Sequence, residues 1–135
     1  MNGLANFVGI PYLDRGRTLA GADCYGLVRL ALQALRGIEL PDYGTYAGGA
    51  DHDGITETIE RGLHERWRAV TAPVPFDLIV LRVAGKPRHV GLVVAPERFL
   101  HAPEPLHGRG GTSRIECWTD RLWINRIEGF YRHAS

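Results

Sequence analysis

The hydrophobic residues of this chain change their period once, near residue 66, and this change limits the possible folds more than any other feature. Residues 23–36 are apolar nearly all round, which predicts a buried helix capped by Asp23 and ended by Gly37. Residues 54–65 carry a single apolar stripe and predict a second, amphipathic helix. The N-terminal half of the chain is therefore expected to be helical.

Beyond these helices the pattern is typical of strands, with short β-branched or aromatic runs separated by Gly and Pro. The runs are residues 67–71, 77–83, 89–95, 98–102, 113–117 and 126–132. Helices followed by strands predict an α+β fold, with N-terminal helices packed on a central antiparallel β-sheet. We also expect a short helix at 3–8, a loop at 14–22, and Asp51 or Asp53 as the cap of the second helix.

Length and composition exclude several classes of protein. A chain of 135 residues predicts one domain, residues 1–135, and its 44% hydrophobic and 23% charged fractions are ordinary for a globular protein. A net charge of +1 argues against a nucleic-acid binder, and no run is long enough for membrane insertion. Residues 1–13 lack a basic region and a small-residue cleavage site, so we expect no signal peptide.

Cys24 is expected to begin the first helix, directly after its capping residue Asp23. The helix dipole and the free N–H groups at this position stabilise a thiolate, which predicts a lowered thiol pKa and a nucleophilic cysteine. The same N–H groups suit a developing oxyanion. The alternative is a buried structural cysteine that packs as a small hydrophobe.

Two histidines downstream favour the nucleophile. A hairpin turning near Pro96 would place His101 opposite Gly91, so that His89 and His101 project from one face of neighbouring strands. His89 would then take the thiol proton while His101 binds its other ring nitrogen. We expect Gly91 to leave room on that face for the helix that carries Cys24. For each histidine alone, the alternative is an ordinary hydrogen-bonded residue.

Other chemistries find less support. A zinc site would need closely spaced ligand pairs, which Cys24, His89, His101 and Cys117 do not form. The glycine-rich residues 108–111 do not connect a strand to a helix, so we expect no phosphate site there. No metal and no cofactor are expected.

Short motifs in a fixed order resemble those of the NlpC/P60 family of papain-like cell-wall cysteine peptidases. They are Pro11-Tyr12, Asp23-Cys24-Tyr25-Gly26, Phe76-Asp77-Leu78, His89-Val90-Gly91 and His101-Ala102. The resemblance implies a papain-like NlpC/P60 fold, with Cys24 as nucleophile, His89 as base and His101 as the orienting third member. It also implies that the Tyr12 hydroxyl helps to hold substrate or oxyanion. Two residues depart from the family pattern, Tyr25 in place of Ser and Phe76 in place of Gly.

The substrate implied by this resemblance is a peptidoglycan stem peptide, cut between D-glutamate and the diamino acid. Gly9-Ile10-Pro11-Tyr12, Cys24-Tyr25-Gly26-Leu27-Val28-Arg29 and Gly129-Phe130-Tyr131-Arg132 further resemble the phage tail-tip and gene-transfer-agent subgroup. That subgroup implies a virion tail-tip component that is assembled in the host cytoplasm, contacts other tail-tip proteins and acts at the bacterial cell wall. The expected absence of a signal peptide favours this interpretation.

Two other functions stay open at this point. The aromatic segment 118–132 suggests a structural tail-tip or baseplate assembly module whose triad is masked or vestigial. The third hypothesis is a thiol amidase or acyltransferase that acts on another amide.

Overall fold

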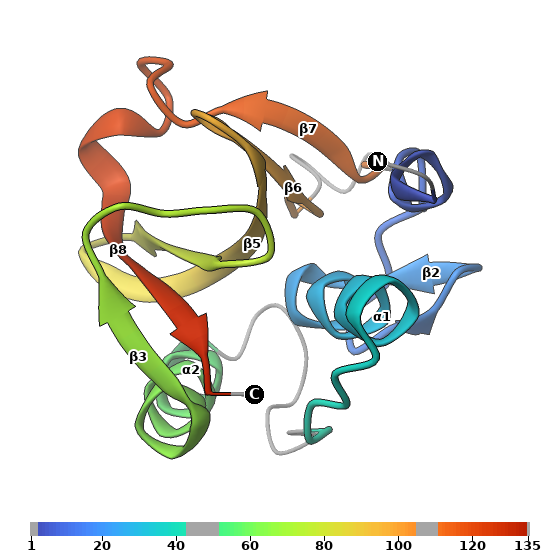
Figure 1. The fold of residues 1–135 in the computed structure, drawn as a ribbon, viewed down its shortest axis with the longest axis horizontal. Coiled ribbons are helices and arrows are strands. Elements are labelled where there is room, and N and C mark those ends of the chain that lie inside the picture. Colours follow the sequence, from blue (N-terminus) through green and yellow to red (C-terminus); the bar gives the residue numbers. More distant parts are fainter. Residues whose placement is uncertain (1–2, 43–51, 105–110, 135) are drawn as a thin grey trace.

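The computed structural model of the chain describes residues 3–42, 52–104 and 111–134, and Figure 1 shows their arrangement. The helical elements are η1 (Leu4–Phe7), α1 (Cys24–Arg36), α2 (His52–Arg66) and η3 (Ile124–Arg126). The strands are β1 (Arg17–Thr18), β2 (Gly21–Ala22), β3 (Trp67–Val70), β4 (Leu78–Val83), β5 (Lys86–Ala95), β6 (Arg98–His101), β7 (Arg114–Cys117) and β8 (Ile127–His133). None of the helices among these residues is long and apolar enough to cross a membrane.

Six of the strands form one antiparallel sheet in the order β3-β8-β4-β5-β6-β7. Both α1 and α2 pack against β5, the long central strand (Figure 1). The predicted α+β fold with helices on a central antiparallel sheet is therefore confirmed. Its strands fall where the short β-branched and aromatic runs predicted them.

Helix α1 has the predicted ends. The Asp23 carboxylate accepts a hydrogen bond from the backbone N–H of Gly26, and Gly37 ends the helix at φ 66°. The prediction of apolar burial all round was too broad. Leu27, Val28, Ala31 and Leu32 are buried, but Ala34 is exposed, so the helix buries one face.

The sheet separates two apolar cores, because successive side chains of a strand point to opposite faces. Val90, Leu92 and Val94 of β5 join the core formed with α1 and α2. Val93 of the same strand joins the second core, which contains Phe99, Trp118 and Trp123. The prediction that Gly91 makes room for α1 was wrong. A Cβ at Gly91 would meet Phe99, the Leu100 carbonyl and His101 of β6, so the glycine admits the neighbouring strand.

Two further differences lie before and within the helices. Residues 14–22 were expected to be a loop, but they include the small β1–β2 hairpin, in which Thr18 pairs with Gly21. Helix α2 begins at His52, earlier than predicted; Asp51 lies outside the described residues, and the side chain of Asp53 is not described.

Candidate active site

Cys24 is the first residue of α1 and is partly buried. It lines a cavity of about 290 Å³ together with Tyr12 and His89. A backbone bridge between Tyr12 and Ala22 holds the tyrosine beside the segment that leads into Cys24. The tertiary structure thus brings three of the predicted site residues, from η1–β1, α1 and β5, to one cavity.

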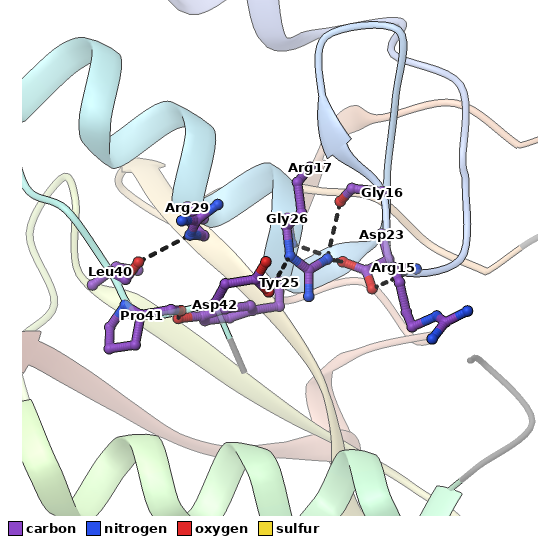
Figure 2. A network of polar contacts seen from close by, with 10 residues as sticks. All are labelled: Arg15, Gly16, Arg17, Asp23, Tyr25, Gly26, Arg29, Leu40, Pro41 and Asp42. Carbon is purple, nitrogen blue, oxygen red and sulfur yellow. Dashed lines mark hydrogen bonds and ion pairs between the residues drawn. The ribbon is translucent and has the colours of Figure 1, made fainter. Parts of the chain in front are cut away.

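Asp23, the residue before Cys24, is the centre of a network of polar contacts (Figure 2). Its carboxylate accepts hydrogen bonds from the backbone N–H of Gly26 at 2.7 Å, the backbone N–H of Arg15 at 3.1 Å and Nη1 of Arg17 at 2.8 Å. Arg17 in turn donates from Nε to Asp42 at 3.1 Å. The predicted cap is confirmed, and its carboxylate also ties the loop before Cys24 to the start of α1.

The segment after α1 folds back onto the same network (Figure 2). The Tyr25 hydroxyl donates to the Pro41 carbonyl at 2.5 Å, and Nε of Arg29 donates to the Leu40 carbonyl at 2.9 Å. Tyr25 lines a separate, mainly apolar cavity of about 50 Å³, formed with residues of α2 such as Ile59 and Leu63. The tyrosine that departs from the family pattern therefore lies outside the lining of the cavity that holds His89.

The expected lowering of the thiol pKa was wrong. Burial, and then the charge of Asp23, raise the pKa of Cys24 to about 12. Backbone N–H groups of Val90 and Tyr25 and the charge of Arg17 act in the opposite direction without offsetting the rise. The helix start does favour the thiolate as predicted, but a dry environment and an adjacent carboxylate outweigh it.

His89 and His101 meet as the strand pattern predicted. The β5–β6 register pairs Leu92 with Leu100, which brings His101 next to Gly91. Nε2 of His89 lies 2.8 Å from Nδ1 of His101, within hydrogen-bonding distance. Burial, together with their mutual proximity, lowers the pKa of His89 to about 3, and burial lowers that of His101 to about 4. Both imidazoles are therefore neutral at physiological pH.

Glu116 was missed by the sequence analysis. Its Oε2 atom lies 2.5 Å from Nε2 of His101 and also accepts a hydrogen bond from Nε of Arg114 at 3.0 Å. Burial acts to raise the pKa of Glu116, but the hydrogen bonds from His101 and Arg114 hold it below its ordinary value. The sequence signal for Glu116 was its position as a polar residue next to Ile115 in a predicted strand. The sequence did not show that this strand, β7, would pair with β6.

Trp123 packs against both histidines from the second core. Its ring stacks on His89 with centroids 5.9 Å apart and meets His101 edge-on at 5.0 Å. Phe99 completes the apolar enclosure, with its ring 4.3 Å from that of His101. These contacts explain why the histidines are dry and why their protonation is disfavoured.

Tyr12 presents a protonated hydroxyl to the cavity. Burial, and then the charge of Cys24, raise the pKa of Tyr12 above its ordinary value, so the hydroxyl stays a hydrogen-bond donor. Within residues 3–42, 52–104 and 111–134, no group of His, Cys, Asp and Glu side chains is placed to hold a metal ion. The site thus offers a thiol, two neutral imidazoles, a carboxylate and a phenol.

Comparison with known proteins places the chain in a family. The NlpC/P60 family profile matches residues 9–127. The chain belongs to the NlpC/P60 family, whose members are cysteine peptidases and peptidoglycan hydrolases. No match was found among curated protein sequences.

Solved structures share the fold of this NlpC/P60 domain. An NLP/P60 protein similar to a lipoprotein, from Staphylococcus aureus subsp. aureus Mu50, superposes with a TM-score of 0.66 at 20% identity over 96% of this chain. An NlpC/P60 family protein from Bacillus cereus ATCC 10987 superposes with a TM-score of 0.68 at 20% identity, over 96% of this chain. The NlpC/p60 domain of the peptidoglycan hydrolase SagA superposes with a TM-score of 0.61 at 18% identity, over 94% of this chain.

The lengths of these relatives differ from that of the present chain. The chain spans 38% of the Staphylococcus structure and 37% of the Bacillus structure, but 89% of the SagA domain. The similarity therefore concerns the shared NlpC/P60 fold.

Phe76, the second departure from the family pattern, lies in a turn whose backbone conformation favours glycine. Phe76 adopts φ 75°, a left-handed conformation that favours glycine, at the entry to β4. Asp77, which follows it, accepts from the backbone N–H of Val74 at 2.8 Å and from two nitrogens of Arg132 at 2.9 and 2.8 Å. The turn that glycine would favour is thus formed here with Phe76, and Asp77 fixes it to β8.

Proposed function

We propose that this NlpC/P60 domain is a cysteine endopeptidase that hydrolyses peptidoglycan stem peptides between D-glutamate and the diamino acid. The observation that carries the proposal is the shared cavity of Cys24 and His89, with His89 hydrogen-bonded to His101. A thiol, a neutral imidazole and an orienting group are the parts that nucleophilic acyl transfer requires.

The reaction proceeds through a thioester. Sγ of Cys24 attacks the scissile carbonyl carbon while His89 accepts the thiol proton, and a tetrahedral oxyanion forms. The C–N bond then breaks as His89 returns this proton to the leaving amine. Water attacks the thioester while His89 takes a proton from it, and the C–S bond then breaks as His89 returns that proton to Sγ, which releases the new carboxyl group and restores the thiol.

The resting site favours general-base catalysis over a preformed ion pair. The pKa of Cys24 is raised to about 12 and that of His89 is lowered to about 3, so both groups are neutral before substrate arrives. Proton transfer then accompanies attack on the carbonyl. The Tyr12 hydroxyl, which lines the same cavity, is available as a donor to the substrate or to the oxyanion.

The charges around the cavity support an anionic substrate. Its lining contains Arg88, Arg114 and Arg126, against the single carboxylate of Glu104 among the residues described there. Stem peptides carry free carboxylates, and guanidinium groups bind carboxylates with favourable geometry. The motifs Gly9–Tyr12 and Cys24–Arg29 support the further proposal that the enzyme belongs to a phage tail tip, contacts other tail-tip proteins and acts locally at the cell wall.

Two of the aromatic residues that suggested the structural alternative belong to the core. Trp118 and Trp123 of the aromatic segment 118–132 are buried in the second core, where they stabilise the sheet and the histidines. These two tryptophans are therefore not available to an assembly surface. A thiol amidase or acyltransferase on another amide uses the same cysteine and histidines, so only the products distinguish it.

The test is mass spectrometry of peptides released from purified peptidoglycan by the wild type and by Cys24→Ala. We expect release by the wild type alone, with fragment masses that place the cut between D-glutamate and the diamino acid. Cys117→Ala is the matched control, because it removes the other cysteine, on β7, and is expected to keep full activity. Equal release by Cys24→Ala would refute the thiol mechanism, and fragments cut elsewhere would refute the bond assignment.

Labelling of phage particles tests the tail-tip assignment separately. Antibodies against the chain should bind particles of the producing strain at the tip of the tail. Labelling of the bacterial envelope in cells without particles would contradict this location while leaving the peptidase proposal intact.

A further inference from the structure

A carboxylate stands at the far end of the histidine pair. Oε2 of Glu116 lies 2.5 Å from Nε2 of His101, whose Nδ1 lies 2.8 Å from Nε2 of His89. We infer that Glu116 is a positioning residue that sets the tautomers of both histidines and keeps the Nδ1 atom of His89 unprotonated, ready to accept the thiol proton. The inference rests on the proposed function, in which His89 is the base.

The tautomers follow from counting donors and acceptors along this row. An ionised carboxylate only accepts hydrogen bonds, so the short contact requires a proton on Nε2 of His101. A neutral imidazole carries one N–H, which leaves Nδ1 of His101 as an acceptor. Nε2 of His89 must then be the donor in the contact between the rings. The single proton of His89 is thereby used, and its Nδ1 atom holds a lone pair.

The opposite arrangement would disable the base. Without the carboxylate, His101 is free to carry its proton on Nδ1 and to donate to Nε2 of His89. His89 would then hold its own proton on Nδ1, the atom that must accept the thiol proton. The contact between the two rings is compatible with either arrangement, so a group at the end of the pair has to select between them, and at His101 that group is Glu116.

Neighbouring residues fix the position and the charge of the Glu116 side chain. Arg114, two residues earlier on β7, donates to the same Oε2 atom at 3.0 Å, and β7 pairs with β6 so that Leu100 opposes Ile115. The Glu116 side chain is only 21% exposed. Its pKa is held below the ordinary value, so the carboxylate is ionised at neutral pH. The same charge stabilises the imidazolium that forms when His89 accepts a proton.

Nitrogen NMR of the imidazole rings tests the inference without any substrate. In the wild type, we expect Nε2 of both His89 and His101 to carry the proton and both Nδ1 atoms to be unprotonated. In Glu116→Leu, we expect proton density on Nδ1 of His101 and of His89. Glu116→Gln keeps a carbonyl acceptor for Nε2 of His101, so the wild-type tautomers should persist. Protonated Nδ1 of His89 in the wild type would overturn the inference.

Kinetics on purified peptidoglycan provide the second test. Glu116→Leu should lower kcat by at least about 100-fold, the lower range of what a positioned base contributes, with KM changed less than about twofold. Glu116→Gln should retain kcat within about tenfold of the wild type, because it restores the hydrogen bond without the charge. Glu128→Leu is the matched control, since Glu128 is a partly buried strand carboxylate that binds Tyr131 at 2.6 Å instead of a histidine.

The outcomes separate this inference from the proposed function. A folded Glu116→Leu variant with wild-type kcat and wild-type tautomers would refute the positioning role while the peptidase proposal stands. A wild type that releases no peptides would refute the proposed function, and the NMR tautomers would still decide whether Glu116 sets the histidine protons. Loss of activity in Glu128→Leu equal to that in Glu116→Leu would show a general structural effect and would also overturn the inference.

Discussion

The guanidinium of Arg17 lies 2.8 Å from Oδ1 of Asp23, the residue that immediately precedes Cys24 (Figure 2). Asp23 has to cap α1, yet its negative charge opposes formation of the thiolate. Arg17 lowers the pKa of Cys24 and so counters part of that effect. The β1–β2 hairpin, which carries Arg17, therefore contributes to the electrostatics of the cysteine.

Removing this cation should make the thiol less reactive. In a Cys117→Ala background, Arg17→Gln is expected to raise the pKa of Cys24 and to slow its alkylation by iodoacetamide about three- to tenfold, since the thiolate is the reactive form. Arg15→Gln is the control, because Arg15 binds Asp23 through its backbone N–H only. Equal alkylation rates in Arg17→Gln and Arg15→Gln would contradict this role.

The loss of activity on acidification should occur at an unusually low pH. His89 must be unprotonated to act as the base, and its pKa is lowered from 6.5 to about 3 by burial and by His101. Activity is therefore retained as pH falls below 6.5 and is lost only as pH approaches the lowered value. The measurement is kcat/KM for peptide release between pH 3 and 8, because this ratio reports the free enzyme. Half-maximal activity near pH 6.5 would argue against a dry histidine pair.

Gly26 should not tolerate a side chain. A Cβ at this position would lie 2.0 Å from the Gly16 carbonyl oxygen, a backbone atom that cannot move alone. Gly26→Ala is expected to lower the free energy of unfolding by about 3 kcal/mol and to displace the start of α1. Gly37→Ala, where φ is 66° but space is open, should cost about 1 kcal/mol. Urea unfolding distinguishes them, and equal losses would contradict the close approach.

Trp123 should affect catalysis as well as stability. Trp123→Phe leaves a gap against His89 and His101, so we expect a loss of about 1–3 kcal/mol in unfolding free energy and a kcat lowered about three- to tenfold. Trp118→Phe is the matched control, because Trp118 is buried in the same core but packs on Phe130. It should lose similar stability without the change in kcat. If kcat fell equally in both variants, Trp123 would have no specific effect on the histidines beyond packing in the core.

Local sequence by itself determined the elements and the first members of the site. Asp23 and Gly37 mark the ends of α1 because capping depends on the residues within one turn. His89 and His101 were predicted to meet because a tight hairpin fixes the register of the two strands that it joins. Both of these relationships are short in sequence, and both are confirmed in the fold.

Only the tertiary structure decided the electrostatics of the site and the contact between Glu116 and His101. Glu116 reaches His101 through the pairing of β7 with β6, and the chain between these strands is too long to fix a register. The pKa of Cys24 follows from burial, which depends on what α2 and the sheet place around the thiol, so the helix start alone predicted the wrong direction. Gly91 proved to lie against Phe99 and His101 of β6, on the face of β5 opposite to Val90 and Leu92, because only the tertiary structure decides which face of the sheet the helices cover.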